Sequence, residues 1–542
     1  MTTRESPDPK PSGPSEPGSG QFSGRSLLQS TSVVSGMTLL SRILGLARDV
    51  VFARYFGATI VMDAFIVANR IPNMLRRFFA EGAFSQGFVP VMARYRERHN
   101  HEEAREFVDA VAGTLGLILF LVTAVGVIAA PLLVAAVAPG FIGDDGRFDL
   151  ATLMLRFTFP YLLFVSLTAF AGGVLNTYGK FAVPAFTPVI LNVVLISFAI
   201  GLSPHLEEPG MALAYGVFVA GVVQLAFQLP FLARIRTLPR PSWRPAHDGV
   251  RRVGRLMLPA IFGSSVAQIN VLLGGIIASL LGVGKISLLY YSDRLMEFPL
   301  GLFGIALATV TLPALSRQFA AQSMRGFART IDWSMKLVVF IAVPSALGLI
   351  LLSEPLVAAI FYGGAFTAND VALAALSLEA FAIGLVGFSF VKILAPAYFA
   401  REDTKTPVRM ALVALLVNFV LSVVLAYLLT RIGYEGTHAG LALATSVAAL
   451  VNAGLLYRGL RGDGIITHSV GWGSMLIRFL VANALLAAVL LYLAKPLDWW
   501  LALSVVERCA WLLVQVVAGA AVYFLALLAI GMRPGDFRMD SD

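Results

Sequence analysis

The stretch SRILGLARDVVFARYFGATIVMDAFIVANRIPNMLRRFFAEGAFSQGFVP, residues Ser41 to Pro90, organises the rest of this chain. It reads as two membrane-spanning helices that nevertheless carry the charged side chains of Arg42, Arg48, Asp49, Asp63, Arg70, Arg76, Arg77 and Glu81. A charged side chain at the centre of a bilayer costs about 2.5 to 3.5 kcal/mol, so six of them facing lipid would cost on the order of 15 to 20 kcal/mol. We therefore expect these side chains to line an aqueous space.

The spacing of these charges places them in stripes along the helices. Residues seven apart on an α-helix lie within about 20° of each other. Asp63, Arg70 and Arg77 follow this interval, and Glu81 lies one turn beyond Arg77 on the same face. The same interval relates two further pairs, Arg42 with Asp49 and Ser41 with Arg48.

The composition of the whole chain is that of a polytopic membrane protein. Of its 542 residues 58% are hydrophobic and 13% are charged, whereas soluble proteins are nearer 45 to 50% apolar. The net charge of +9 does not indicate nucleic-acid binding, because the basic residues fall mainly in short connections between apolar segments. The single cysteine, Cys509, excludes an intramolecular disulfide.

Apolar stretches of about 20 residues or more predict about fourteen transmembrane helices. They lie near residues 27–56, 60–93, 107–138, 150–175, 183–203, 211–235, 252–282, 285–316, 330–353, 370–400, 407–431, 437–460, 472–494 and 505–531. Alternate loops are basic, which predicts that both termini are cytoplasmic. The first 25 residues are rich in Pro, Ser and Gly and are predicted to form a disordered cytoplasmic tail; residues 533–542 are predicted to form a second cytoplasmic tail.

The chain contains an internal repeat. The segment around Arg70 matches the segment around Arg294, and the segment around Asn192 matches the segment around Asn418, both at an interval of about 225 residues. The repeat predicts two six-helix lobes, 26–245 and 246–465, followed by an added helix pair in 466–532. Two parallel copies around a central site are a transporter plan.

The chemistry of the sequence is cationic and not catalytic. No ATPase-type phosphate loop, clustered histidine motif or nucleophile beside a recognisable base is present, so we expect no enzyme activity, no metal site and no cofactor. Arginine keeps its charge and presents a planar fork of donors, so several arginines around one cavity favour an anionic, phosphorylated ligand.

The alternative is that some of these arginines pair internally with Asp49, Asp63 or Glu81, or lie at helix ends near the headgroups. Structural pairing is a stronger alternative for Arg70 and Arg77 than for Arg42 and Arg48. In the second copy, Asp293, Arg294 and Glu297 are expected to supply one facing arginine and a carboxylate partner, and a structural ion pair is as plausible for Asp293.

Four motifs resemble the MurJ (MviN) lipid II flippase family. They are SRILGLARD from Ser41, NMLRRFFAEGAFSQGFVP from Asn73, YYSDRLMEFPLGLFGIALATVTLPALS from Tyr290, and KILAPAYFAREDTKTPV from Lys392. The resemblance extends from about residue 27 to the C-terminus. It implies a member of the multidrug/oligosaccharidyl-lipid/polysaccharide exporter superfamily, with two lobes in a V-shaped, MATE-like arrangement around a cationic cavity.

The resemblance also implies an activity, a location and a set of site residues. The expected activity is transport of lipid II, the undecaprenyl-pyrophosphate-linked peptidoglycan precursor, from the inner to the outer leaflet of the bacterial cytoplasmic membrane. The substrate-binding residues would be Arg42, Arg48, Arg76 and Arg294. The supporting residues would be Asp49, Asp63, Arg70, Arg77, Glu81, Asp293 and Glu297. The helices in 466–532 would form an apolar groove for the lipid tail.

The expected mechanism is alternating access, with the headgroup shielded in a wet cavity while the polyprenyl chain stays in lipid. Resetting would use the membrane potential or a monovalent cation, and the sequence does not choose between them. Association with the cell-wall synthesis machinery is a further expectation. Two rival hypotheses are a drug antiporter, against which the arginine excess argues, and a scaffold that recruits cell-wall synthases.

Overall fold

A computed structural model describes residues 24–532, except for 80–82, 99, 144–145 and 467–471. The regular elements of this described part are helices, with no strand among them, which confirms the expected all-α fold. The two predicted tails, 1–25 and 533–542, lie almost entirely outside the described residues.

The first copy of the repeat forms one bundle of helices. Helix α1 packs against α8, α2 packs against α6, and α9 packs against both α7 and α8. The helices are α1 (Gly24–Phe56), α2 (Ile60–Phe79), α3 (Ala83–Arg98), α4 (His101–Ile128), α5 (Ala130–Val137), α6 (Arg147–Thr158), α7 (Tyr161–Thr177), α8 (Ala182–Gly201) and α9 (Met211–Arg234), with short 3₁₀ turns η1 (Pro139–Phe141) and η2 (Ser203–His205).

The second copy is built around a central helix, α14, which packs against α11, α12 and α16. Its helices are α10 (Asp248–Ser279), α11 (Lys285–Ala320), α12 (Met324–Leu351), α13 (Ser353–Ile360), α14 (Ala368–Phe399), α15 (Lys405–Arg431) and α16 (Thr437–Gly462). Helix α10 packs against α15 and also against α3 and α4 of the first copy. The predicted boundary between the lobes at 245 and 246 stays a prediction.

The last helices are α17 (Trp472–Tyr492), α18 (Leu497–Ala502) and α19 (Val505–Ala529). Helices α17 and α19 pack on each other, with α17 also against α12 and α19 against α13. A capping box starts α19, in which the Ser504 hydroxyl and the Glu507 carboxylate each accept a backbone N–H of the other residue. Thr367 and Asp370 start α14 in the same way.

Among the described residues, ten helical segments are long and apolar enough to cross a membrane. The other four predicted spans correspond to α1, α2 with α3, α10 and α11. Of these, α1, α2 and α11 carry the intramembrane charges, which lower their hydropathy. The structure is therefore consistent with the fourteen spans expected from the sequence.

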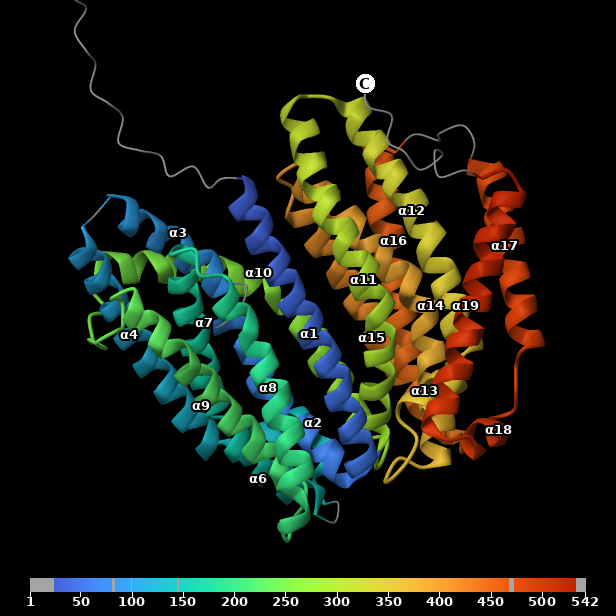
Figure 1. Cartoon of the computed structure of the whole chain (residues 1–542), viewed down its shortest axis with the longest axis horizontal. Helices are drawn as coiled ribbons and strands as arrows, with labels where there is room; N and C mark the ends of the chain where they lie inside the picture. The colour runs from blue at the N-terminus through green and yellow to red at the C-terminus, as the bar shows by residue number, and fades with distance from the viewer. Residues whose placement is uncertain (1–23, 80–82, 99, 144–145, 467–471, 533–542) are drawn as a thin grey trace, which may run out of the picture.

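The two copies form a V, which confirms the expected arrangement. Figure 1 shows them side by side, diverging where α1 begins and converging where α1 ends and α11 begins. We call these the wide end and the narrow end. At the narrow end the two copies are joined directly by hydrogen bonds. The Ala365 amide donates to the Arg54 carbonyl at 2.8 Å, and the Tyr291 hydroxyl donates to the Gly57 carbonyl at 3.3 Å.

Candidate functional site

A cavity of about 570 Å³ lies between the two copies, at mid-depth along α1. Its walls come from α1, α2 and α8 of the first copy and from α11 and α14 of the second, with smaller contributions from α7 and α9. The basic lining residues are Arg42, Arg48, Arg76, Arg294 and Lys392, and the acidic ones are Asp49 and Glu297. Among the described residues, the lining therefore has five basic side chains against two acidic ones.

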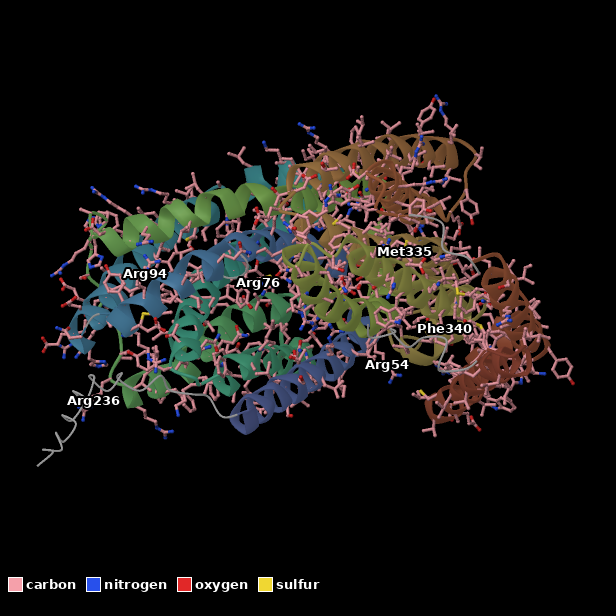
Figure 2. The ribbon with its side chains drawn as sticks, turned by 90° about the horizontal axis from the view of Figure 1, so that it is seen from above. Arg54, Arg76, Arg94, Arg236, Met335 and Phe340 are labelled. Atoms are coloured by element: carbon pink, nitrogen blue, oxygen red, sulfur yellow. The ribbon has the colours of Figure 1, made fainter. Side chains whose placement is uncertain are left out.

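The basic side chains gather inside the molecule and are distinct from the basic surface loops. Figure 2 shows Arg76 near the middle of the molecule, whereas Arg94 and Arg236 lie toward the outer part of the first copy. Arg94 and Arg236 are exposed, and Arg76 is half-buried. The sequence predicts arginines at a cavity and other arginines in the loops between helices, and these residues are placed accordingly.

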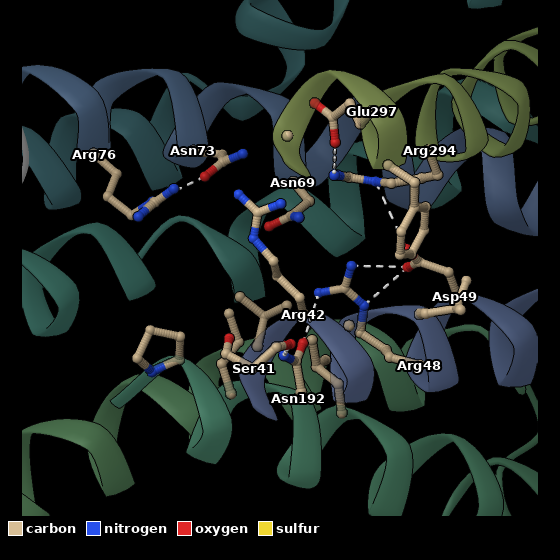
Figure 3. A pocket seen from close by; sticks show the side chains of 18 of the residues that line it. Ser41, Arg42, Arg48, Asp49, Asn69, Asn73, Arg76, Asn192, Arg294 and Glu297 are labelled. Carbon is tan, nitrogen blue, oxygen red and sulfur yellow. Dashed lines mark hydrogen bonds and ion pairs between the residues drawn. The ribbon is translucent and has the colours of Figure 1, made fainter. Parts of the chain in front are cut away.

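One cluster of charges joins the two copies across the cavity (Figure 3). Arg48 donates to Asp49 Oδ1 through Nη2 at 2.8 Å and through Nε at 3.0 Å. The Tyr290 hydroxyl donates to the same oxygen at 2.8 Å. Arg294 Nε lies 3.6 Å from Asp49 Oδ2, and Arg294 Nη1 donates to Glu297 Oε2 at 2.8 Å. Asp49 is only 3% exposed, so the arginines of both copies share one buried carboxylate.

Arg48 is held from the other side by a buried amide on α8. Its Nη1 donates to Asn192 Oδ1 at 3.0 Å, and Asn192 Nδ2 donates to the Ser41 carbonyl at 3.0 Å. The guanidinium therefore uses three nitrogens in a fixed orientation. The contact between α1 and α8 at Asn192 therefore holds the Arg48 side chain at the cavity wall.

Arg42 differs from Arg48 in having an available fork of donors. Within the described part of the chain, no hydrogen bond or ion pair involves its side chain. Figure 3 shows its guanidinium projecting into the pocket, toward Asn69. The group packs on Gly301 of α11, where an added Cβ would lie 2.4 Å from Arg42 Nη1. Gly301 thus gives Arg42 room at the junction of the two copies.

The charge stripe of Asp63, Arg70 and Arg77 does not line the cavity. Asp63 is fully buried and accepts from the Gly284 and Ser287 amides at 2.6 and 2.9 Å and from the Ser287 hydroxyl at 2.6 Å. Its carboxylate therefore caps the N-terminus of α11, a helix of the other copy.

The remaining predicted charges also lie away from the cavity lining. The Arg70 guanidinium lies against Gly275 of α10, and within the described residues its Nη1 has no hydrogen-bond partner. Arg77 is exposed, and Asp293 is half-buried on α11. Glu81 lies outside the described residues. Pairing of Arg70 and Arg77 with a carboxylate, and the individual roles of these residues, stay predictions.

The sequence did not assign to the site five polar residues that belong to the cavity or its cluster: Asn69, Asn73, Asn192, Tyr290 and Lys392. Asn73 accepts from Arg76 Nε at 2.9 Å, and Lys392 Nζ lies 3.5 Å from the Leu300 carbonyl. A signal was present for some of them. Asn69, Asn73 and Arg76 follow helical spacing on one face of α2, and Asn192 stands at an aligned position of the repeat.

A second cavity, of about 510 Å³, lies between α12, α14, α16 and α17. Its walls are mainly apolar, with Phe390, Leu394 and Leu476 among them. At its edge Trp472 Nε1 donates to Asp332 Oδ1 at 2.6 Å, and Lys336 Nζ lies 2.7 Å from Asp332 Oδ2. This cavity therefore lies between the second copy and the added C-terminal helices, and it has apolar walls and a polar rim.

Comparison with known proteins identifies relatives along nearly the whole chain. The family profile described as "Lipid II flippase MurJ" matches residues 52–510. A "Probable lipid II flippase MurJ" of Vibrio cholerae is 46% identical over 521 residues, which cover 94% of this chain and 98% of that protein. The "Lipid II flippase MurJ" of Burkholderia cenocepacia is 42% identical over 517 residues, covering 94% of this chain and 99% of that protein.

Solved structures agree with the architecture. A structure described as "Lipid II flippase MurJ, inward closed conformation" superposes with a TM-score of 0.74 at 26% identity, covering 91% of this chain and 97% of that chain. An inward-facing multidrug resistance MATE family transporter of the MOP superfamily superposes with a TM-score of 0.63 at 16% identity, covering 80% of this chain and 98% of that chain. The second likeness concerns the fold alone.

Proposed function

The chain belongs to the lipid II flippase MurJ family, and from this premise we propose that its cationic cavity holds the pyrophosphate and sugar headgroup of lipid II during translocation. As a member of this family it is a transporter and not an enzyme, a multi-pass protein of the bacterial inner membrane that moves lipid II for peptidoglycan synthesis.

The observation that carries the headgroup proposal is the charge of the cavity between the lobes. Of the lining residues that the structure describes, five are basic and two are acidic, and Asp49 is already shared by Arg48 and Arg294. A pyrophosphate would meet guanidinium forks suited to bidentate oxygen contacts, with Arg42 offering donors that are not engaged. In our proposal Arg42, Arg48, Arg76 and Arg294 bind the headgroup, while Asn69, Asn73 and Lys392 add hydrogen bonds.

The binding cluster also provides a link between the headgroup and the lobes. Arg294 of α11 reaches Asp49 of α1, and both ions lie in the same cavity as the proposed headgroup. A pyrophosphate would compete with Asp49 and Glu297 for the arginine donors. Occupancy would therefore exchange a bond between the copies for bonds to the ligand, which biases the arrangement of the lobes.

We assign the wide end to the cytoplasm, with both termini cytoplasmic, and the narrow end to the outer face. The positive-inside rule supports this orientation, because loops at the wide end, such as 235–247, carry arginines, whereas 202–210 and 361–367 at the narrow end contain no Lys or Arg. The described state would then be closed outside. Alternating access between this state and one open at the narrow end would deliver lipid II from the inner to the outer leaflet.

The polyprenyl tail requires an apolar path, for which we propose the added helices. The second cavity lies where α17 meets α12, α14 and α16, and its apolar wall suits an isoprenoid chain. We further propose that resetting uses the membrane potential, worth about 2.3 kcal/mol per charge per 100 mV, or a monovalent cation, without a cofactor. Association with cell-wall synthases is the remaining proposal for its partners.

The test is a leaflet-accessibility assay for lipid II in cells depleted of the native flippase and supplied with variants of this chain. Arg294→Ala should abolish outer-leaflet lipid II, and Arg294→Lys should restore only part of it, because lysine keeps the charge but lacks the fork. Arg431→Ala, which removes an exposed arginine at the end of α15, is the matched control and should match the parent. Unchanged lipid II exposure in Arg294→Ala cells would refute the proposed site.

A variant of another cavity arginine tests the scaffold hypothesis, and the charge of the cavity argues against the antiporter. A scaffold that recruits synthases would remain functional when its cavity arginines are neutralised, so normal growth of Arg48→Ala cells would favour a scaffold. A drug antiporter would export a cationic compound, and the arginine excess of the cavity would repel that substrate.

A further inference from the structure

In the part of the chain that the structure describes, four glycines line the contact between the two copies at the narrow end: Gly57, Gly140, Gly284 and Gly364. We call them the glycine seam. A Cβ added to Gly140 would lie 2.2 Å from the Ser279 carbonyl oxygen, and one added to Gly364 would lie 2.2 Å from the Arg54 carbonyl oxygen. Real Cβ atoms are essentially never this close to another heavy atom, so an alanine at either position requires the two backbones to separate.

The other two glycines, Gly57 and Gly284, also lie against the backbone of the opposite copy. A Cβ on Gly57 would lie 2.4 Å from the Ala365 carbonyl oxygen, and one on Gly284 would lie 2.5 Å from the Ala58 carbonyl oxygen. Each of the four contacts joins the first copy to the second, and each copy supplies two glycines. Backbone therefore meets backbone throughout the seam, with no flexible side chain between them to absorb a change.

The seam follows the internal repeat. Gly140 and Gly364 are separated by the same 224 residues as Asp63 and Ser287. Gly140 packs at the end of α10, and Gly364 packs near the end of α1, the helix that corresponds to α10 in the repeat. The two contacts are thus related by the pseudo-symmetry of the chain, which argues that the close approach belongs to the architecture and not to one local loop.

Hydrogen bonds hold the same segments together. The Ala365 amide donates to the Arg54 carbonyl at 2.8 Å, and the Gly140 amide donates to Ser279 Oγ at 3.1 Å. These donors reach their acceptors only because the neighbouring glycines have no side chain. An added methyl group would therefore break polar contacts as well as crowd the backbone.

We propose that the glycine seam sets how tightly the narrow end closes, and thereby the balance between the states open at the wide end and at the narrow end. The proposal rests on the alternating-access function proposed above. At the glycine seam the two backbones touch without large side chains interlocking between them. The two copies can therefore close tightly there and still separate without side-chain rearrangement. A single methyl group should then shift the balance toward the state open at the narrow end.

Gly140→Ala is the sharpest probe, because its backbone does not have the positive φ that disfavours alanine at Gly57, Gly284 and Gly364. Its matched control is Gly201→Ala, at the end of α8, where an added Cβ meets nothing within 4 Å. For the second copy, Gly364→Ala (φ +61°) is paired with Gly433→Ala (φ +71°), whose Cβ also meets nothing within 4 Å. Within each pair, the added Cβ meets the backbone of the opposite copy in the seam variant and meets nothing in the control.

The readout is accessibility of the cavity to a membrane-impermeant maleimide. Cys509 is replaced by serine, and Leu191 of the cavity wall is replaced by cysteine as the reporter. Spheroplasts expose the outer face, and inverted membrane vesicles expose the cytoplasmic face. A minor state holds on the order of 0.1 to 10% of the molecules, so Gly140→Ala should raise labelling from outside about tenfold or more and lower labelling from inside.

Each result supports or overturns the proposal. Outside labelling that rises in Gly140→Ala and Gly364→Ala, but not in Gly201→Ala and Gly433→Ala, supports it. Labelling equal to that of the parent in both seam variants overturns it. Loss of both seam variants from the membrane while their controls persist also overturns it, because the contact would then serve folding and not the balance of states. The assay reads cysteine labelling and not binding or transport of lipid II, so its failure is distinct from a failure of the proposed headgroup site.

Discussion

Replacing Asp63 with asparagine should open the narrow end. The Asp63 carboxylate on α2 accepts three hydrogen bonds from the first turn of α11, at 2.6 to 2.9 Å. Hydrogen bonds to a charged acceptor are worth about 1.5 to 3 kcal/mol each. Asparagine keeps one acceptor oxygen but turns an NH₂ group toward backbone donors, so at least one bond is lost and an N–H is left unpaired. The closed state should lose about 2 to 4 kcal/mol, which is about 30-fold to several-hundred-fold in its population.

A distance measurement between the copies tests this magnitude. Spin labels at Glu207→Cys and Glu435→Cys, both exposed at the narrow end, would report the separation by double electron–electron resonance in a Cys509→Ser background. The parent should give one short distance, and Asp63→Asn should add a longer one, with the ratio of long to short populations raised about 30-fold or more. Ser287→Ala, which removes one of the three donors, should give a smaller fraction of the long distance. An Asp63→Asn distribution identical to that of the parent would refute the prediction that the bonds of Asp63 to α11 hold the narrow end closed.

Three further predictions concern orientation of a cavity arginine, anchoring of the last helices and acid stability. Asn192→Ala should weaken binding of lipid II to the purified protein about tenfold, because Arg48 loses its amide partner. Asn418→Ala removes the counterpart of Asn192 in the second copy and should leave binding unchanged. Arg508→Met should lower the thermal unfolding temperature through loss of about 2 kcal/mol or more. This buried side chain donates to three backbone carbonyls, those of Ala358 in α13, Tyr362 just after α13 and Leu503 between α18 and α19, and an unchanged temperature would contradict that role. The Thr406 hydroxyl, and then the backbone amides of Thr406 and Lys405, hydrogen-bond the Asp403 carboxyl at the start of α15 and lower its pKa. The stabilisation from Asp403 is therefore complete above the unfolded pKa of about 3.9 and is lost as pH falls through the folded value. Thermal melts of the parent and of Asp403→Ala should differ at pH 6 and converge in acid.

Much of the architecture follows from the sequence. Charged side chains within apolar segments require a wet interior or a partner, whatever the packing, because lipid cannot solvate them. The alignment of Arg70 with Arg294 predicts two copies of one unit, and the excess of arginine predicts an anionic ligand. The structure brings the four arginines expected to bind substrate, Arg42, Arg48, Arg76 and Arg294, to one cavity, and their roles there stay predictions.

The direction in which each stripe of charge faces depends on the tertiary structure. Helical periodicity placed Asp63 and Arg70 on one face of α2, but it could not say that this face meets α11 and α10 at the narrow end. Tyr290 illustrates the same limit. Its hydroxyl matters only because α11 crosses α1 at Asp49, 241 residues away along the chain.

The sequence by itself determined that this chain spans the membrane many times, repeats one unit twice and encloses arginines, because these properties depend on the composition and period of single helices. Only the tertiary structure decided which charges line the cavity, which carboxylate bonds to the start of α11, and which glycines bring the backbones of the two copies into contact. The reason is that a helix period specifies a face, whereas a contact requires the crossing point of two helices, and that crossing point is set by the packing of all the others.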